Sequence, residues 1–307
     1  MIAVGGFNTS IDKLLIVDDL VPGSVLRARA AEAWPGGKGA HVALAAAVLG
    51  AGVRLSGLVD AREREWFESW LRARGVEFHG IEFPGPVRTC LTIHDAHGRT
   101  TEIREPGPSI DEGTWQSAAV EFQQRSRDAR LAVLSGSVPP GAPASAYADL
   151  VSALAPVPVL VDAAGELLRL AVEAAPFCIK PNREEAEALA GIALDSLEAA
   201  VRAARLLASR GVRLVIISRG DEGAVACWDG RACRIAAPPV IARNVVGAGD
   251  CLLGGVASAL ARDDGITDAI RLGVACGSAK VLSDEIGLVR RDDVDALLPQ
   301  VRVEWLD

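Results

Sequence analysis

Along most of the chain, short apolar stretches that end in small or polar residues alternate with helical segments. Strands are expected over residues 2–7, 53–59, 76–83, 131–134, 157–162, 177–180 and 214–218, and helices over residues 42–49, 63–74 and 251–261. Strands that alternate with helices favour a parallel sheet covered on both faces. Ligands bind such sheets at the carboxyl ends of the strands. The pattern therefore predicts an α/β fold with its functional site at that edge.

Two segments, residues 14–34 and 84–106, do not fit this alternation. Each contains extended stretches separated by turn residues, and these stretches are residues 14–17 and 25–29 in the first segment and 88–94 and 99–105 in the second. We expect both segments to form strand pairs outside the main sheet. The polar face of the second pair is either solvated or part of a lid over a substrate.

The composition fits this class of fold and excludes several functions. Half of the residues are apolar but only 4% are aromatic, which suits tightly packed helices on a parallel sheet better than an all-β protein. The net charge is −8 and no Lys/Arg block is present, so nucleic acid is not an expected partner. We expect no membrane span, because the most apolar stretch, residues 40–59, contains Arg54 and the break Gly50-Ala51-Gly52.

The cysteines and the N-terminus indicate a cytoplasmic protein. Six cysteines are scattered without a CxxC pair, which indicates reduced thiols rather than disulfides or a zinc site. Residues 1–7 show no basic segment ahead of an apolar one, so no signal peptide is expected.

The stretch from Asn244 to Asp250 is the first candidate site. Gly247, Ala248 and Gly249 precede a strongly apolar helical run, and a glycine turn at a helix start offers unpaired N–H groups to an anion such as phosphate. Asp250 at its rim could accept the proton of an attacking hydroxyl, which indicates phosphoryl transfer. Taken alone, the heptapeptide fits equally well a simple turn with an aspartate cap.

Two further motifs lie in the first 41 residues. Asp12 follows the first strand and could bind sugar hydroxyls or serve as a turn residue. Gly37 and Lys38, within a glycine-rich stretch at a helix start, could hold an anion or a hydroxyl-rich ligand. No Walker signature occurs, so phosphate would need a different architecture from the P-loop.

Four motifs, in order, carry a resemblance to a known family. They are residues 8–13, 36–39, 180–185 and 247–250. The chain resembles the ribokinase-like, phosphofructokinase-B carbohydrate kinases over nearly its whole length. Residues 101–108 and 134–141 are similar to the hexose-phosphate branch, which contains 1-phosphofructokinase and tagatose-6-phosphate kinase. The resemblance implies one α/β kinase domain over residues 1–307, with a three-layer fold, a mostly parallel central sheet and a small β-sheet lid from segments near 14–34 and 84–106.

The resemblance also implies ATP, Mg²⁺ and roles for individual residues. The catalytic group would be Asp250 as base with Gly247, Ala248 and Gly249 as the anion hole. The sugar or sugar phosphate would contact Asp12, Gly37, Lys38, His41, Arg88, Cys90 and Ser137. The nucleotide would contact Lys180, Asn182, Ser218, Gly220, Gly223 and Gly249, and Mg²⁺ would be near Asn182 and Glu185, three apart on one helix face.

Two departures affect the substrate. His41 and Cys90 stand where the branch usually has asparagine, so side-chain amides are lost from positions expected to face the sugar. The family lid often pairs two subunits, which implies a homodimer in which Arg27 or Arg29 reaches the neighbour's site. Two alternatives stay open: a kinase of an unphosphorylated sugar or nucleoside, and a non-catalytic sugar- or nucleotide-binding regulator.

Overall fold

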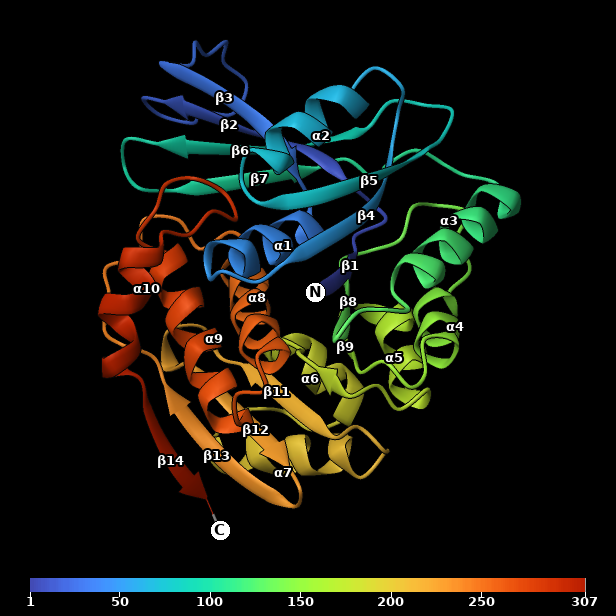
Figure 1. Ribbon diagram of the computed structural model, residues 1–307. Helices are drawn as coiled ribbons and strands as arrows, with labels where there is room; N and C mark the ends of the chain where they lie inside the picture. The colour runs from blue at the N-terminus through green and yellow to red at the C-terminus, as the bar shows by residue number, and fades with distance from the viewer. Residues whose placement is uncertain (307) are drawn as a thin grey trace.

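The computed structural model describes residues 1–306 and contains two β-sheets (Figure 1). The larger sheet has the strand order β14-β13-β12-β11-β10-β9-β8-β1-β4-β5. Its strands are β1 Ile2–Gly5, β4 Val53–Val59, β5 Val76–Glu82, β8 Leu131–Ser135, β9 Val159–Asp162, β10 Cys178–Ile179, β11 Leu214–Ser218, β12 Ala224–Trp228, β13 Arg231–Ala236 and β14 Arg302–Leu306. Neighbours from β11 to β5 run parallel, whereas β12, β13 and β14 are added antiparallel. The predicted mostly parallel sheet is confirmed.

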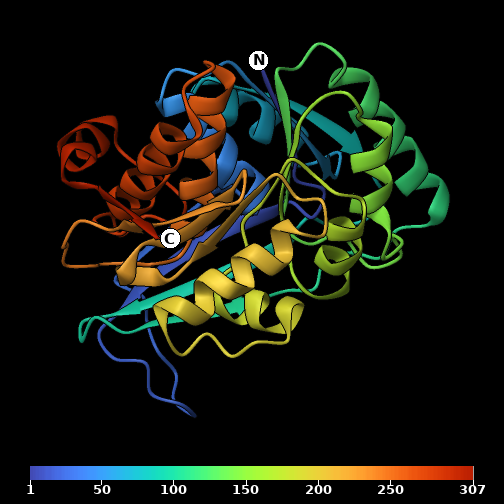
Figure 2. The same ribbon diagram turned by 90° about the horizontal axis from the view of Figure 1, so that it is seen from below.

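Helices cover both faces of this sheet and complete three layers (Figure 2). On one face α1, α8 and α9 pack against one another, and on the other α4, α5, α6 and α7 contact one another in succession. The helices are α1 Lys38–Val48, α2 Arg64–Arg72, α3 Glu112–Arg125, α4 Ala146–Ala153, α5 Gly165–Glu173, α6 Arg183–Ala190, α7 Leu197–Ala208, α8 Ala248–Ala261, α9 Ile266–Lys280 and α10 Arg291–Leu297, with 3₁₀ turns η1 Gly220–Glu222 and η2 Leu298–Gln300. Within residues 1–306, no helix has the length and apolar character to cross a bilayer.

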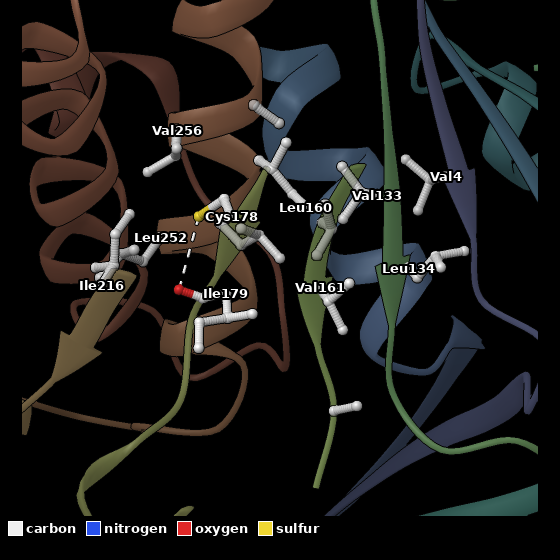
Figure 3. Packing of buried hydrophobic residues seen from close by; sticks show 14 of the residues in the cluster. Val4, Val133, Leu134, Leu160, Val161, Cys178, Ile179, Ile216, Leu252 and Val256 are labelled. Atoms are coloured by element: carbon white, nitrogen blue, oxygen red, sulfur yellow. Dashed lines mark hydrogen bonds between the residues drawn. The ribbon is translucent and has the colours of Figure 1, made fainter. Parts of the chain in front are cut away.

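Most side chains in the core between sheet and helices are aliphatic (Figure 3), and Phe7, Phe122 and Tyr147 are among its aromatic members. Leu252 and Val256 of α8 belong to the same buried cluster as residues of β8, β9 and β10. Glycines let the helices approach closely: a Cβ on Gly254 would lie 2.7 Å from the Val42 carbonyl oxygen of α1, and one on Gly255 would lie 2.9 Å from the Cα of Gly273 in α9. Helix α8 is therefore held rigidly, with its N-terminus at the carboxyl edge of the parallel strands.

The smaller sheet has the strand order β3-β2-β6-β7 and lies at the top of Figure 1. Its strands are β2 Ser10–Val17, β3 Ala30–Gly36, β6 Arg88–Asp95 and β7 Thr100–Arg104. The two predicted excursions therefore combine into one sheet, because β2 pairs with β6 in parallel.

One predicted strand of this sheet is wrong. Residues 25–29 are not a strand, and Val25 is 98% exposed. The chain instead pairs with β2 over Ala30–Gly36, where Trp34 is buried against Leu14 and Ile286. Burial of the Trp34 ring favours this later register, a tertiary contact that the local pattern does not contain.

Candidate active site

One cleft of ≈ 1070 Å³ collects the carboxyl ends of the parallel strands and one face of the smaller sheet. Ser135, Asp162 and Ser218, which end β8, β9 and β11, line it from the large sheet. Arg88 and Cys90 of β6 line it from the smaller sheet. The glycine-rich starts of α1 and α8 border the same cleft. The site therefore lies at the edge of the sheet that the strand pattern predicts.

The anion turn, residues 247–249, lies at the N-terminus of α8. Gly247 has φ 84°, and a Cβ there would lie 2.7 Å from the Cα of Gly287, so both the backbone conformation and the space require glycine. The Ala248 N–H donates to the Val245 carbonyl at 3.1 Å and closes the turn. Gly249 follows in the first turn of α8, where N–H groups lack intrahelical partners. Together with the helix dipole, this arrangement suits an anion.

A buried imidazole links two buried carboxylates beside this turn. His41 Nδ1 lies 2.8 Å from Asp250 Oδ2, and His41 Nε2 lies 2.7 Å from Asp12 Oδ2. All three side chains are less than a tenth exposed. Burial alone would lower the pKa of His41, but the two aspartates outweigh it and raise the pKa to about 9. The imidazolium therefore donates one hydrogen bond to each carboxylate at neutral pH.

The same contact keeps Asp250 ionised. Burial favours the neutral acid, but the hydrogen bond from His41 and the charge of Lys38 hold the pKa of Asp250 below its ordinary value. Because His41 engages Oδ2, Oδ1 remains for the proton of a substrate hydroxyl. The geometry therefore suits a general base with a fixed orientation.

Two lysines converge on Asp162 near the anion turn. Lys38 Nζ lies 3.7 Å and Lys180 Nζ 3.5 Å from the Asp162 carboxylate, which is 1% exposed. A Cβ on Gly249 would lie 3.2 Å from Lys180 Nζ, so this ammonium borders the turn. Asp162 holds the pKa of Lys38 above its usual range against the opposing effect of burial. Both oxygens of Asp162 lack hydrogen-bond donors, so the lysines keep their own donors for a ligand.

The end of the cleft under the smaller sheet contains arginine. Arg88 donates to the carbonyls of Asn8 at 2.9 Å and Glu105 at 3.0 Å, while its buried Nε has no partner. The Asn8 side chain in turn donates to the Ser137 hydroxyl at 2.9 Å. A guanidinium fixed in this way, with a donor left over, suits a phosphate group.

The candidate nucleotide side lies around the start of α6. Asn182 is the N-cap of α6, not a residue on its face: Asn182 Oδ1 accepts from the Glu185 N–H, and Glu185 Oε2 accepts from the Asn182 N–H, each at 2.9 Å. This capping box corrects the prediction of one shared helix face, because a cap residue precedes the helix. Burial raises the pKa of Glu185. Ser218 and Gly220 line the cleft beside this cap, because Asn182 and Ser218 form a parallel β-bridge.

Comparison with known proteins supplies the family. The model of the pfkB family carbohydrate kinases matches residues 3–288. The chain belongs to the pfkB family of carbohydrate kinases. It is 37% identical to a 1-phosphofructokinase of Xanthomonas campestris over 83% of both chains, and 30% identical to the 1-phosphofructokinase of Bacillus subtilis over 100% of both. The crystal structure of Escherichia coli phosphofructokinase-2 in complex with potassium covers 97% of this chain and 98% of its own, with a TM-score of 0.91 and 28% identity.

Most residues predicted for the site of this pfkB kinase do line the cleft, and two do not. The Ala248 N–H donates to the Val245 carbonyl inside the turn, so it is not available to an anion. Gly223, at φ 89°, lies where a Cβ would be 2.0 Å from the Ile235 carbonyl oxygen, so it serves the approach of β12 to β13. The sequence marks both loops by their glycines alone, and only the structure distinguishes Gly249, which lines the cleft, from Gly223, which packs against another strand.

Several residues that line the cleft were not predicted, among them Asp162 and Arg104. Asp162 ends β9, and the pattern of polar strand ends contained it without distinguishing it from its neighbours. Arg104 of β7 lies directly opposite Cys90 of β6 and lines the cleft. Its position could have been read from the hairpin register, because Cys90 and Arg104 share one face of the sheet.

Proposed function

We propose that this pfkB kinase transfers the γ-phosphoryl group of ATP to a hydroxyl of a sugar phosphate, in the manner of 1-phosphofructokinase or tagatose-6-phosphate kinase. The observation that carries the proposal is the ionised, oriented Asp250 beside the anion turn, in one cleft with Arg88. The relatives named 1-phosphofructokinase support this class of substrate.

Asp250 would act as the general base. The acceptor oxygen attacks the γ-phosphorus, the bond from that phosphorus to the β-bridging oxygen breaks, and the hydroxyl proton passes to Asp250 Oδ1 while ADP leaves. The Gly249 N–H, Lys38 and Lys180 would stabilise negative charge on the transferred group. Asp162 would keep the two ammonium groups together between turnovers.

The nucleotide would lie along Asn182, Ser218 and Gly220, with Mg²⁺ beside its phosphates. Glu185 uses Oε2 in the capping box, which leaves Oε1 for a hydrated cation. A hard cation that keeps several waters fits oxygen donors of this kind. When bound, Mg²⁺ would offset phosphate charge.

At the acceptor end, Arg88 and Ser137 would bind the phosphate of the substrate. Asp12 would bind sugar hydroxyls, although its Oδ1 already accepts from Ser10 at 2.7 Å and its Oδ2 from His41. Cys90 offers only a thiol, whose pKa burial raises, so it would contact the sugar as a small apolar group.

We also propose a homodimer through the smaller sheet in a cytoplasmic protein. Val25, Leu26 and Ile103 expose apolar surface there, which pairing of two copies would cover. Arg27 would then reach toward the neighbouring site. Six free cysteines support a reducing compartment. Sedimentation equilibrium tests the dimer, and a monomer at all concentrations contradicts it.

The function is tested by an Asp250→Asn variant in an ATP-dependent assay with hexose phosphates. The rate kcat should fall about 10²- to 10⁴-fold while ATP affinity stays nearly unchanged. Asp268→Asn is a matched control, because Asp268 has the equivalent place in the first turn of α9 but is 68% exposed. A near-normal rate in Asp250→Asn would show that another group is the base.

A further inference from the structure

Lys280, the last residue of α9, is a buried charge outside the groups considered so far. Its exposed fraction is 0%, and no carboxylate of residues 1–306 lies within ion-pairing distance of its Nζ. Its Nζ donates a hydrogen bond to the Asn244 carbonyl at 2.8 Å. Burying an ammonium group without an anionic partner costs several kcal/mol, so a purely space-filling role would favour an apolar residue here.

The partner of this ammonium begins the loop that presents the anion turn. The Asn244 side chain fixes the same loop, because its Oδ1 accepts from the Val246 N–H at 3.0 Å and its Nδ2 donates to the Asp284 carbonyl at 2.8 Å. Gly247 follows directly and packs against Gly287. Hydrogen bonds thus tie residues 243–247 to residues 281–287, and Lys280 directly precedes the second of these segments.

The surroundings of Lys280 allow it to be charged at neutral pH. Burial lowers its pKa to about 8, while Cys251 of α8 and Asp284 and Glu285 of the following segment act in the opposite direction. Cys276 lies on the same helix one turn earlier and is neutral, because burial raises its pKa to about 12. The positive charge of Lys280 therefore lies at the Asn244 carbonyl, three residues before Gly247. No other cation of the described chain bonds this carbonyl.

We propose that the Lys280 ammonium is a built-in monovalent cation that fixes the Asn244 carbonyl and thereby holds the anion turn in place. Lys280 is a positioning residue, since it acts through residues 244–247 and does not line the cleft. The inference rests on the proposed phosphoryl transfer. It implies that this kinase needs no added monovalent cation.

The first experiment uses the wild-type protein. Its activity is measured in potassium, ammonium and tetramethylammonium chloride at one ionic strength. Equal rates in the three salts are expected, because the site already contains its own ammonium. Strong activation of the wild type by potassium or ammonium overturns the proposal, and this outcome does not depend on whether any variant folds.

The second experiment removes the side chain. Lys280→Ala should lower kcat about 10- to 100-fold, the effect of losing its one charge-assisted hydrogen bond, with little change in the KM of the acceptor. Ammonium or potassium ions, but not tetramethylammonium, should restore the rate by entering the space. A folded variant with normal kinetics, or one that small cations do not rescue, overturns the assignment.

A measurement of thermal stability, which does not depend on enzymatic activity, separates this inference from the proposed function. The melting temperature of Lys280→Ala should rise with ammonium concentration, because a ligand that binds only the folded state stabilises it. Leu272→Ala is the matched control: Leu272 is buried on the same helix, and its loss leaves an uncharged cavity that small cations should not fill. If the wild type phosphorylates no sugar but this thermal response occurs, the proposed function fails and the cation site stands.

Discussion

Replacing His41 by Asn tests the buried carboxylate–imidazolium–carboxylate arrangement. His41 is fully enclosed between Asp12 and Asp250, so solvent screening does not reduce its contribution. Folding raises the pKa of His41 from 6.5 to about 9. Protonation of the imidazole therefore stabilises the folded state at every pH at which the folded chain binds this proton. Converted by linkage, this contribution is about 3 kcal/mol at pH 6, about 2 kcal/mol at pH 7.5 and under about 1 kcal/mol at pH 9.

The sign follows from the direction of the pKa change. Since the folded-state pKa lies above the unfolded one, the stabilisation is present in full below about pH 6.5 and disappears as the pH rises through 9. Lys280, whose pKa is lowered, has the opposite dependence at higher pH, but both proteins contain it and its effect cancels in their difference.

The assay is urea unfolding followed by tryptophan fluorescence from pH 6 to pH 9.5. The difference in unfolding free energy between wild type and His41→Asn should shrink by about 3 kcal/mol over this range. His79→Asn is the control, because it removes a partly exposed pair with Glu121 and should cost under about 1 kcal/mol. Parallel pH curves for wild type and His41→Asn would refute the bridging imidazolium.

Substitutions at three other positions probe the site. Gly287→Ala, with its Cβ 2.0 Å from His41 Cδ2, should displace the imidazole and remove the same pH dependence of stability; retention of that dependence contradicts the packing. Arg88→Ala should raise the KM for phosphorylated acceptors about 10- to 100-fold with Arg88→Lys intermediate, whereas an unchanged KM indicates an unphosphorylated substrate. Glu185→Gln keeps the capping box and should raise the Mg²⁺ concentration for half-maximal activity several-fold; an unchanged requirement places the cation elsewhere.

The amino-acid sequence by itself determined the fold class and the position of the glycine turn before α8. The alternation of strands and helices is a local property, because each element is specified by the period of its own apolar residues. Gly247 is local in the same sense: a left-handed backbone before an apolar helix requires glycine wherever that helix packs. Such features identify the family and the type of reaction, which the comparisons then confirmed.

Only the tertiary structure decided what the polar side chains do to one another. His41 was expected to face the sugar, but it contacts Asp12 and Asp250, which lie 29 and 209 residues away along the chain. Lys280 reaches a carbonyl 36 residues away, and its burial has no local signal. These contacts depend on the order of strands in the sheet and on how closely α8 packs against α1 and α9. The periodic pattern of apolar residues in the sequence predicts neither of these tertiary features.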